Sequence, residues 1–168
     1  MLSPEMLLNA CLHEIKIIKH LATKMPVGGL RYKPSESQRS TLELMQYISN
    51  TASMCGKAAI AGNWEHAEEY ANHAKGTTLE NFAGRMDEQA DELKATFEGV
   101  PSADWVGKDA TLPWGQAVKL GDAMIMLTLQ FLTAYRMQFF LYLKAAGATE
   151  LSTTQCWAGV DPAPAEAK

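Results

Sequence analysis

The residues best suited to metal or acid–base chemistry are the four histidines, which fall into two pairs. His66 and His73 flank Glu69 in the segment WEHAEEYANH, and steps of three and four residues would place all three on one helical face. Two imidazoles and a carboxylate can bind a divalent metal ion. We favour a solvated or loop-stabilising role, with a metal site as the alternative. His13 and His20 lie seven residues apart on a polar helical face, where solvated histidines are expected.

Nucleophilic motifs offer no further candidate. The sequence contains no GxSxG, P-loop, GxGxxG or HExxH motif, and it lacks the strand pattern that the first three require. Cys11 and Cys55 fall on apolar helical faces, where a thiol is usually an inert small hydrophobe. Cys156 follows the last predicted helix, and nothing near it in sequence would lower its pKa. No catalytic residue is assigned, and whether the protein is an enzyme stays open.

Three polar side chains fall within apolar helical faces. Tyr47 belongs to the buried face of the second predicted helix, and Tyr135 and Gln138 belong to that of the last. A buried phenol or amide needs a hydrogen-bond partner. These side chains therefore either bond one another in a satisfied core network or line a wet pocket, and the sequence leaves both open.

Length and composition limit the class of protein. The 168 residues, 47% of them apolar, fit one globular domain, expected over residues 1–160 with a disordered tail at 161–168. A net charge of −4 without Lys/Arg clusters argues against nucleic-acid binding. The longest uncharged apolar stretch, 123–135, is too short to span a bilayer, and the N-terminus lacks the basic region of a signal peptide. Three unpaired cysteines favour a reducing compartment, so we expect a cytoplasmic protein without membrane partners.

Apolar residues recur at helical spacing in four segments, which predicts an all-α four-helix bundle. Capping patterns at Ser3, at Ser40–Glu43 and at Thr77–Glu80 mark three of the helix starts, and Pro26, Gly99 and Gly147 mark stops. The helices are expected at 4–25, at 40–61, from Thr77 to about 98, and at 115–146. Between them, 64–76 is expected to be a short helical turn or ordered loop, and a long ordered loop precedes the last helix. The last helix is apolar on several sides, which favours a subunit interface and a homodimer.

Three segments together resemble one family. LRYKPSESQRSTLELMQYIS (30–49) looks like its loop leading into the second helix. TLPWGQAVKLGDAMIMLT (111–128) is similar to its segment entering the last helix, and YRMQFFLYLKAAG (135–147) looks like the end of that helix. In this order the segments resemble the DinB-like (YfiT-like) superfamily of bacterial four-helix-bundle proteins. The resemblance covers nearly the whole domain and implies the bundle fold.

The resemblance also implies a divalent metal, Zn or Ni in many members, held by one histidine of the second helix and an HxxxH pair of the last. Metal-dependent members include thiol-dependent transferases and isomerases. By position the three histidines fall on Tyr47, Phe131 and Tyr135, while Arg136 and Gln138 match the family's motif. A phenyl ring cannot ligate a metal, and a neutral phenol is a poor ligand for Zn or Ni. We therefore expect a lost metal site and no metal cofactor.

The favoured interpretation is a metal-free DinB-like bundle with a pocket between the second and last helices. The pocket would either bind a small molecule, because it combines apolar area with a few hydrogen-bonding groups, or be vestigial and filled by its own side chains. Its candidate lining residues are Tyr47, Phe131, Tyr135 and Gln138.

Two alternatives remain. One is a metal- and thiol-dependent transferase that uses displaced ligands, namely His66, Glu69 and His73. The other is a non-catalytic, dimeric interaction module that binds a partner protein through its apolar last helix. The partner would contact the helix faces that carry Leu129, Leu132 or Phe139.

Overall fold

The computed structural model describes residues 3–163. Helices make up most of it, with one short hairpin. In chain order the elements are α1 (Pro4–Ala22), η1 (Gly29–Arg31), α2 (Thr41–Ile48), α3 (Thr51–Ala61), α4 (Ala67–Lys75), α5 (Phe82–Glu98), α6 (Asp104–Gly107), β1 (Asp109–Thr111), β2 (Ala117–Lys119), α7 (Leu120–Met124), η2 (Ile125–Leu129), α8 (Gln130–Ala145) and α9 (Thr153–Ala158).

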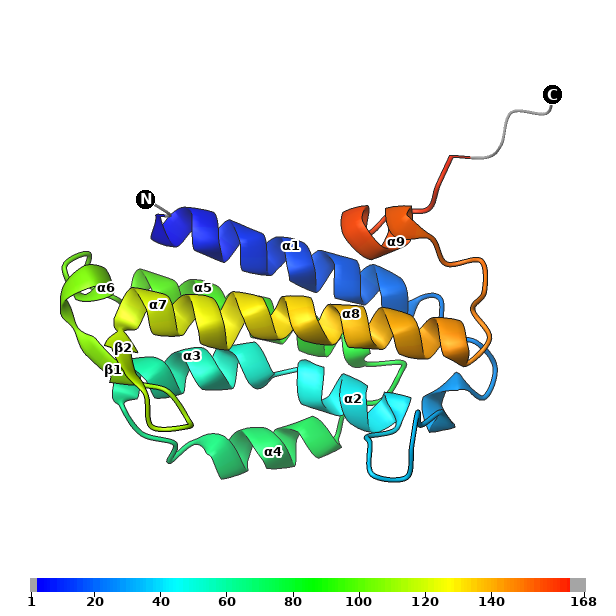
Figure 1. The fold of residues 1–168 in the computed structure, drawn as a ribbon, viewed down its shortest axis with the longest axis horizontal. Coiled ribbons are helices and arrows are strands. Elements are labelled where there is room, and N and C mark those ends of the chain that lie inside the picture. Colours follow the sequence, from blue (N-terminus) through cyan, green and yellow to red (C-terminus); the bar gives the residue numbers. More distant parts are fainter. Residues whose placement is uncertain (1–2, 164–168) are drawn as a thin grey trace.

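Four long helical segments enclose the core, which confirms the predicted all-helical bundle (Figure 1). α1 packs on α5 and α8, while α3 packs on α5 and on the segment that joins α7 to α8. Neighbours run parallel in two cases: α1 with α7–α8, and α3 with α5. The paired contacts that set these directions are Cys11–Thr128 and Glu14–Arg136 for the first, and Ala52–Gln89 and Lys57–Glu92 for the second.

Two of the predicted helix starts are confirmed by their caps. The Ser3 hydroxyl accepts a hydrogen bond from the Met6 N–H, and Pro4 occupies the first turn. Ser40 and Glu43 form the reciprocal capping box, with the Ser40 N–H 2.6 Å from Glu43 Oε2. The first helix ends at Ala22, three residues before the predicted end.

The predicted single helix 40–61 is wrong, because the chain breaks between α2 and α3. Three hydroxyl side chains there donate to backbone carbonyls three or four residues earlier: Ser49 to Gln46, Thr51 to Tyr47 and Ser53 to Asn50. Serine, threonine and asparagine compete with the helical ladder in this way. Their bonds favour a change of direction in an otherwise apolar helix.

Gln89 of α5 fills the break. Its side chain is 1% exposed; the amide nitrogen donates to the Ile48 carbonyl at 3.0 Å, and the amide oxygen accepts from the Ala52 N–H at 2.9 Å. The Ile48 carbonyl at the end of α2 and the Ala52 N–H at the start of α3 have no partner within a helix, and Gln89 supplies one for each. A single buried amide replaces the helical hydrogen bonds that the break removes.

The segment 64–76 contains a nine-residue helix, α4, where a turn or loop was predicted. Because α3 and α5 run parallel, the chain must return along the outside of the bundle between them, and α4 makes that return (Figure 1). The third predicted helix starts later than expected, at Phe82. Its reciprocal turn forms one residue further on than the predicted Thr77–Glu80 box, between Thr78 and Asn81.

The long ordered segment predicted before the last helix contains the short helix α6 and an antiparallel hairpin. The sequence predicted no strands, and that expectation is wrong. The hairpin turn carries Gly115 at φ +87°, a conformation that favours glycine, and Leu112 and Gln116 close it with a 2.9 Å backbone bond. Three-residue strands are too short to leave an alternating pattern in the sequence.

The last helix begins at Leu120, not at 115, and contains a π-helical stretch at Ile125–Leu129. Within it, the Thr128 hydroxyl bonds to the Met124 carbonyl at 2.5 Å and contacts the Cys11 thiol at 3.4 Å. A Cβ on Gly56 of α3 would meet the Thr128 methyl group at 3.4 Å, an ordinary van der Waals contact, so α3 and the π-helical stretch pack closely here.

A buried ion pair joins α1 to α8. Arg136 Nε donates to Glu14 Oε2 at 2.5 Å, and the two side chains are 1% and 11% exposed. The same guanidinium donates to the Cys156 carbonyl of α9 and lies 4.8 Å from the Trp157 ring centroid. One cation thus fixes three helices, and each of its partners compensates part of its desolvation.

The C-terminal segment returns to α1 after α9. Asp161 pairs with Lys24 at 2.6 Å, and this ion pair holds the pKa of the Asp161 carboxyl below its usual value. Of the expected tail 161–168, residues 164–168 lie outside the described residues. None of the helices within 3–163 combines the length and the apolar character needed to cross a membrane.

Removing one partner of the buried ion pair should be costly. Glu14→Gln leaves the Arg136 charge buried without a carboxylate, and we expect a loss of about 3 kcal/mol in the free energy of unfolding, measured by urea denaturation. Asp91→Asn breaks the exposed pair with Lys94 and should leave the midpoint nearly unchanged. Equal effects of the two variants would contradict a special role for the buried pair.

Gln89→Leu should destabilise the protein by about 2–3 kcal/mol, because the Ile48 carbonyl and the Ala52 N–H would both be left buried and unpaired. Gln130→Leu, at an exposed position of α8, is the matched control and should change stability by less than about 0.5 kcal/mol. Similar unfolding midpoints for the two variants would show that the helix break does not depend on Gln89.

Candidate functional site

Three of the four predicted pocket residues meet between α2 and α8. The rings of Tyr47 and Tyr135 pack edge to face with centroids 5.0 Å apart, and those of Phe131 and Tyr135 pack edge to face at 6.1 Å. The Arg39 guanidinium covers the outer side of this group, 4.1 Å from the centroid of the Tyr47 ring. We refer to Tyr47, Phe131 and Tyr135 as the aromatic cluster.

The aromatic cluster leaves almost no free space. The cavity beside it measures about 10 Å³ and is lined by Ile48, Thr51, Ala52, Phe131, Leu132 and Tyr135. That volume is roughly what one water molecule needs. The rings fill the place at which a pocket was predicted.

Gln138, the fourth predicted residue, bonds elsewhere. Its amide nitrogen donates to the Tyr142 hydroxyl at 2.8 Å, and the Tyr142 ring packs edge to face on Tyr32. Glu43, in the first turn of α2, accepts a hydrogen bond from the Ser40 N–H in the capping box. This bond lowers the pKa of its carboxyl. Neither residue joins the aromatic cluster.

The aromatic cluster does not fit the metal that the resemblance implies. Phe131 offers no donor atom, and burial together with the neighbouring Tyr135 raises the pKa of Tyr47 to about 12. The Tyr47 phenol therefore keeps its proton at neutral pH, whereas metal binding by tyrosine uses the phenolate. The donor set and the available volume both disfavour a metal ion at this position.

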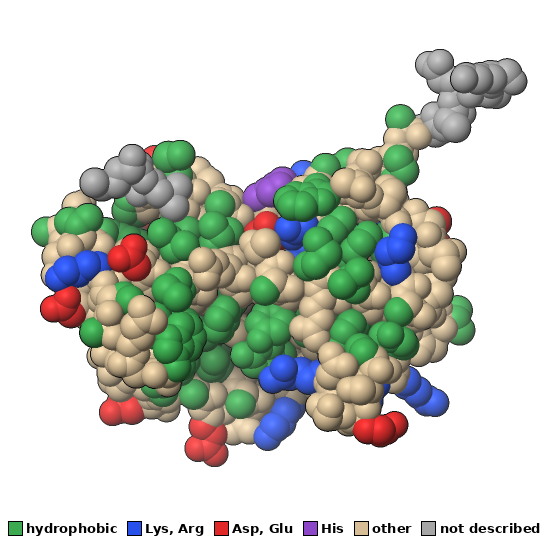
Figure 2. All heavy atoms as spheres, in the orientation of Figure 1, with side chains coloured by type: hydrophobic (Ala, Val, Ile, Leu, Met, Phe, Trp, Pro, Cys, Tyr) green, Lys and Arg blue, Asp and Glu red, His purple; other side chains and the backbone are tan. Residues whose placement is uncertain are grey.

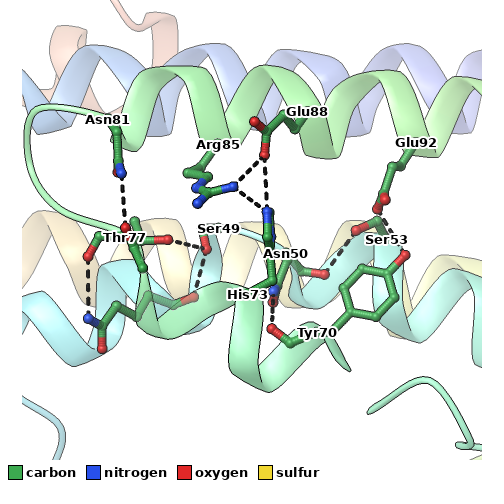
Figure 3. Close-up of polar contacts among 12 residues, drawn as sticks. Ser49, Asn50, Ser53, Tyr70, His73, Thr77, Asn81, Arg85, Glu88 and Glu92 are labelled. Atoms are coloured by element: carbon green, nitrogen blue, oxygen red, sulfur yellow. Dashed lines mark hydrogen bonds and ion pairs between the residues drawn. The ribbon is translucent and has the colours of Figure 1, made fainter. Parts of the chain in front are cut away.

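A second group of polar side chains lines a cleft of about 480 Å³ between α3, α4 and α5. Its residues are Lys57, His66, Glu69, Tyr70, His73 and Glu92, and we refer to it as the α4 cleft. It includes the three residues of the predicted alternative metal site. Figure 3 shows how Tyr70 and His73 reach from α4 toward α5.

Hydrogen bonds and ion pairs hold α4 against the bundle. The Tyr70 hydroxyl donates to Glu92 Oε2 at 2.9 Å (Figure 3). Lys57 Nζ of α3 lies 3.4 Å from Glu92 Oε1. His73 Nε2 contacts Arg85, whose guanidinium also donates to Glu88 at 3.0 Å. On the inner side, Asn50 donates to the Tyr70 carbonyl at 2.6 Å.

His66, Glu69 and His73 line the same cleft but do not form a metal-binding group. The two histidines are seven residues apart, about 10.5 Å along a helix axis, and their side chains do not converge with Glu69 on one point. Within residues 3–163, no group of three or more His, Cys, Asp or Glu side chains could hold a metal.

The remaining histidines and the cysteines lie as the sequence predicts in most cases. His13 is exposed, while His20 is partly buried beside Asp161 at 3.4 Å. Cys11 and Cys55 are core residues, and burial raises the pKa of their thiols to about 11 and about 12. Cys156 is buried too, because α9 folds back over α1 and α8.

Two of the three residues predicted for a protein-interaction surface on the last helix are buried. Leu132 and Phe139 are 2% and 0% exposed, so they belong to the core and cannot contact a partner. Apolar side chains do gather on the face that carries α7 and α8 (Figure 2). Leu141 of α8 is exposed. A homodimer remains a prediction.

Sequence reasoning missed Lys57, Tyr70 and Glu92, which line the α4 cleft together. Each stands on a different helix, and no spacing within one helix indicates that they meet. To predict that these three residues meet, one would need to know the path of α4 along the outside of the bundle. That path follows from the parallel arrangement of α3 and α5 and cannot be read from residue spacing.

No protein-family model matches the sequence, and a search of curated proteins finds no match. Among solved structures, the fold is similar to that of a DinB-like protein, YjoA from Bacillus subtilis, with a TM-score of 0.64 and 18% sequence identity. The similarity covers 87% of this chain and 95% of that one. The chain therefore has the fold of a DinB-like protein.

Proposed function

We propose that this protein is a metal-independent bundle of the DinB-like fold in which the family's metal position has become vestigial. The observation that carries the proposal is the filled space at the aromatic cluster, where a cavity of about 10 Å³ adjoins three rings. Of the two predicted forms of this pocket, the vestigial one has this support, because even a small organic ligand needs far more volume. The cluster then acts as a packing contact between α2 and α8.

The alternative of a metal- and thiol-dependent transferase has less support. His66, Glu69 and His73 would have to supply its metal site, and they do not converge on one point. His73 is also engaged with Arg85. We therefore propose no reaction for this protein. A cytoplasmic location and a homodimer complete the proposal, the former supported by three free cysteines.

If positions 47, 131 and 135 are the former ligand positions, restoring histidines there should restore a metal site. The triple variant Tyr47→His, Phe131→His and Tyr135→His is expected to bind about one equivalent of Zn²⁺ or Ni²⁺, measured by competition with a chromogenic chelator. The double variant that keeps Phe131 should bind much more weakly, since one ligand is missing. Equal affinity of the two variants, or no binding by either in folded protein, would contradict the assignment of these positions.

The burial of Tyr47 predicts a loss of stability at high pH. Its pKa is about 12 in the folded protein and about 10 when unfolded, so the stabilisation is present below about pH 10 and disappears as the pH rises toward 12. Above about pH 10 the thermal midpoint of the wild type should fall more steeply than that of Tyr47→Phe. Parallel curves would show that the phenol is not buried in the cluster.

A further inference from the structure

The α4 cleft has the dimensions of a ligand site. Its volume of about 480 Å³ lies within the range of about 300–1,000 Å³ that small-molecule pockets occupy, and it is far larger than the space beside the aromatic cluster. Polar side chains enter it from three helices, so a bound molecule would be contacted from more than one side. The cleft is separate from the aromatic cluster, and its role does not depend on the loss of the metal site.

The charges that line the cleft do not balance. One lysine stands against two glutamates, which leaves one net negative charge when the histidines are neutral. Lys57 is already paired with Glu92, and Arg85, behind His73, is paired with Glu88. Among the described residues Glu69 takes part in no ion pair or side-chain hydrogen bond. Its carboxylate is therefore the charged group of the cleft that is left for a ligand.

The cleft already holds one ammonium group of its own. Lys57 Nζ lies between Glu92, at 3.4 Å, and the face of the Tyr70 ring, 5.1 Å from its centroid. A carboxylate and an aromatic face together are a common environment for organic cations. These neighbours keep the pKa of Lys57 raised in spite of partial burial. The same surroundings disfavour an anion, since the lysine that would bind it is engaged.

We propose that the α4 cleft binds a small organic cation, a primary ammonium on a short carbon chain, with Glu69 as its carboxylate partner. The volume of the cleft leaves room for the carbon chain beside the Tyr70 ring, and within residues 3–163 its histidines and carboxylates do not converge into a group that could hold a bare metal ion. His66, at the start of α4, contributes a hydrogen-bonding group at the rim.

The test compares three probes of one carbon skeleton: butan-1-amine, butan-1-ol and butanoate, titrated into ¹⁵N-labelled protein at neutral pH. The amine should give saturable shifts of amide signals in α3, α4 and α5, with the alcohol and the carboxylate binding at least about tenfold more weakly. Butanoate binding as tightly as the amine, or no saturable shift with any probe, would overturn the proposal.

Two variants locate the binding. Glu69→Gln should weaken the amine at least about fivefold, whereas Glu68→Gln, its exposed neighbour outside the cleft lining, should change the affinity by less than about twofold. Both positions are exposed, and equal unfolding midpoints would verify that the variants fold. An unchanged affinity of Glu69→Gln would overturn the proposal, and so would Zn²⁺ binding in the cleft that is lost in His66→Ala.

Discussion

The parallel course of α3 and α5 is the constraint on which much of this structure depends. Two adjacent helices that run the same way cannot be joined by a short turn, so the chain has to travel back along the outside of the bundle. α4 is that return, and it touches the bundle through Tyr70, His73 and the end of the helix at Lys75. A helix held mainly at such points leaves space beneath it, and the α4 cleft is that space.

The inner side of the bundle is organised by buried polar groups that each serve several backbones. Gln89 closes the break between α2 and α3, and Arg136 joins α1, α8 and α9. A charge or amide buried in this way tolerates few alternative partners, so each specifies how its helices are placed along one another. The aromatic cluster adds an apolar contact between α2 and α8 at the positions where the resemblance places the metal ligands.

The sequence predicted what depends on local chemistry. The caps at Ser3 and Ser40 and the burial of Cys11 and Cys55 were predicted, since a few neighbouring residues decide them. The break at Ser49–Asn50 was missed because apolar periodicity continues across it, and Gln89, whose bonds complete the break, lies far away in sequence. Of the four residues grouped as a pocket, Tyr47, Phe131 and Tyr135 lie together. Whether such rings enclose a pocket or fill it depends on packing, which residue spacing does not reveal.

The central claim is that aromatic side chains fill the position at which the family would hold its metal, and that this protein binds no metal there. Elemental analysis of the untagged wild-type protein, purified without chelator and measured for Zn, Ni, Fe and Mn together, tests this claim most directly. We predict less than roughly a tenth of an equivalent of any of these metals. Close to one equivalent, retained through dialysis, would contradict it.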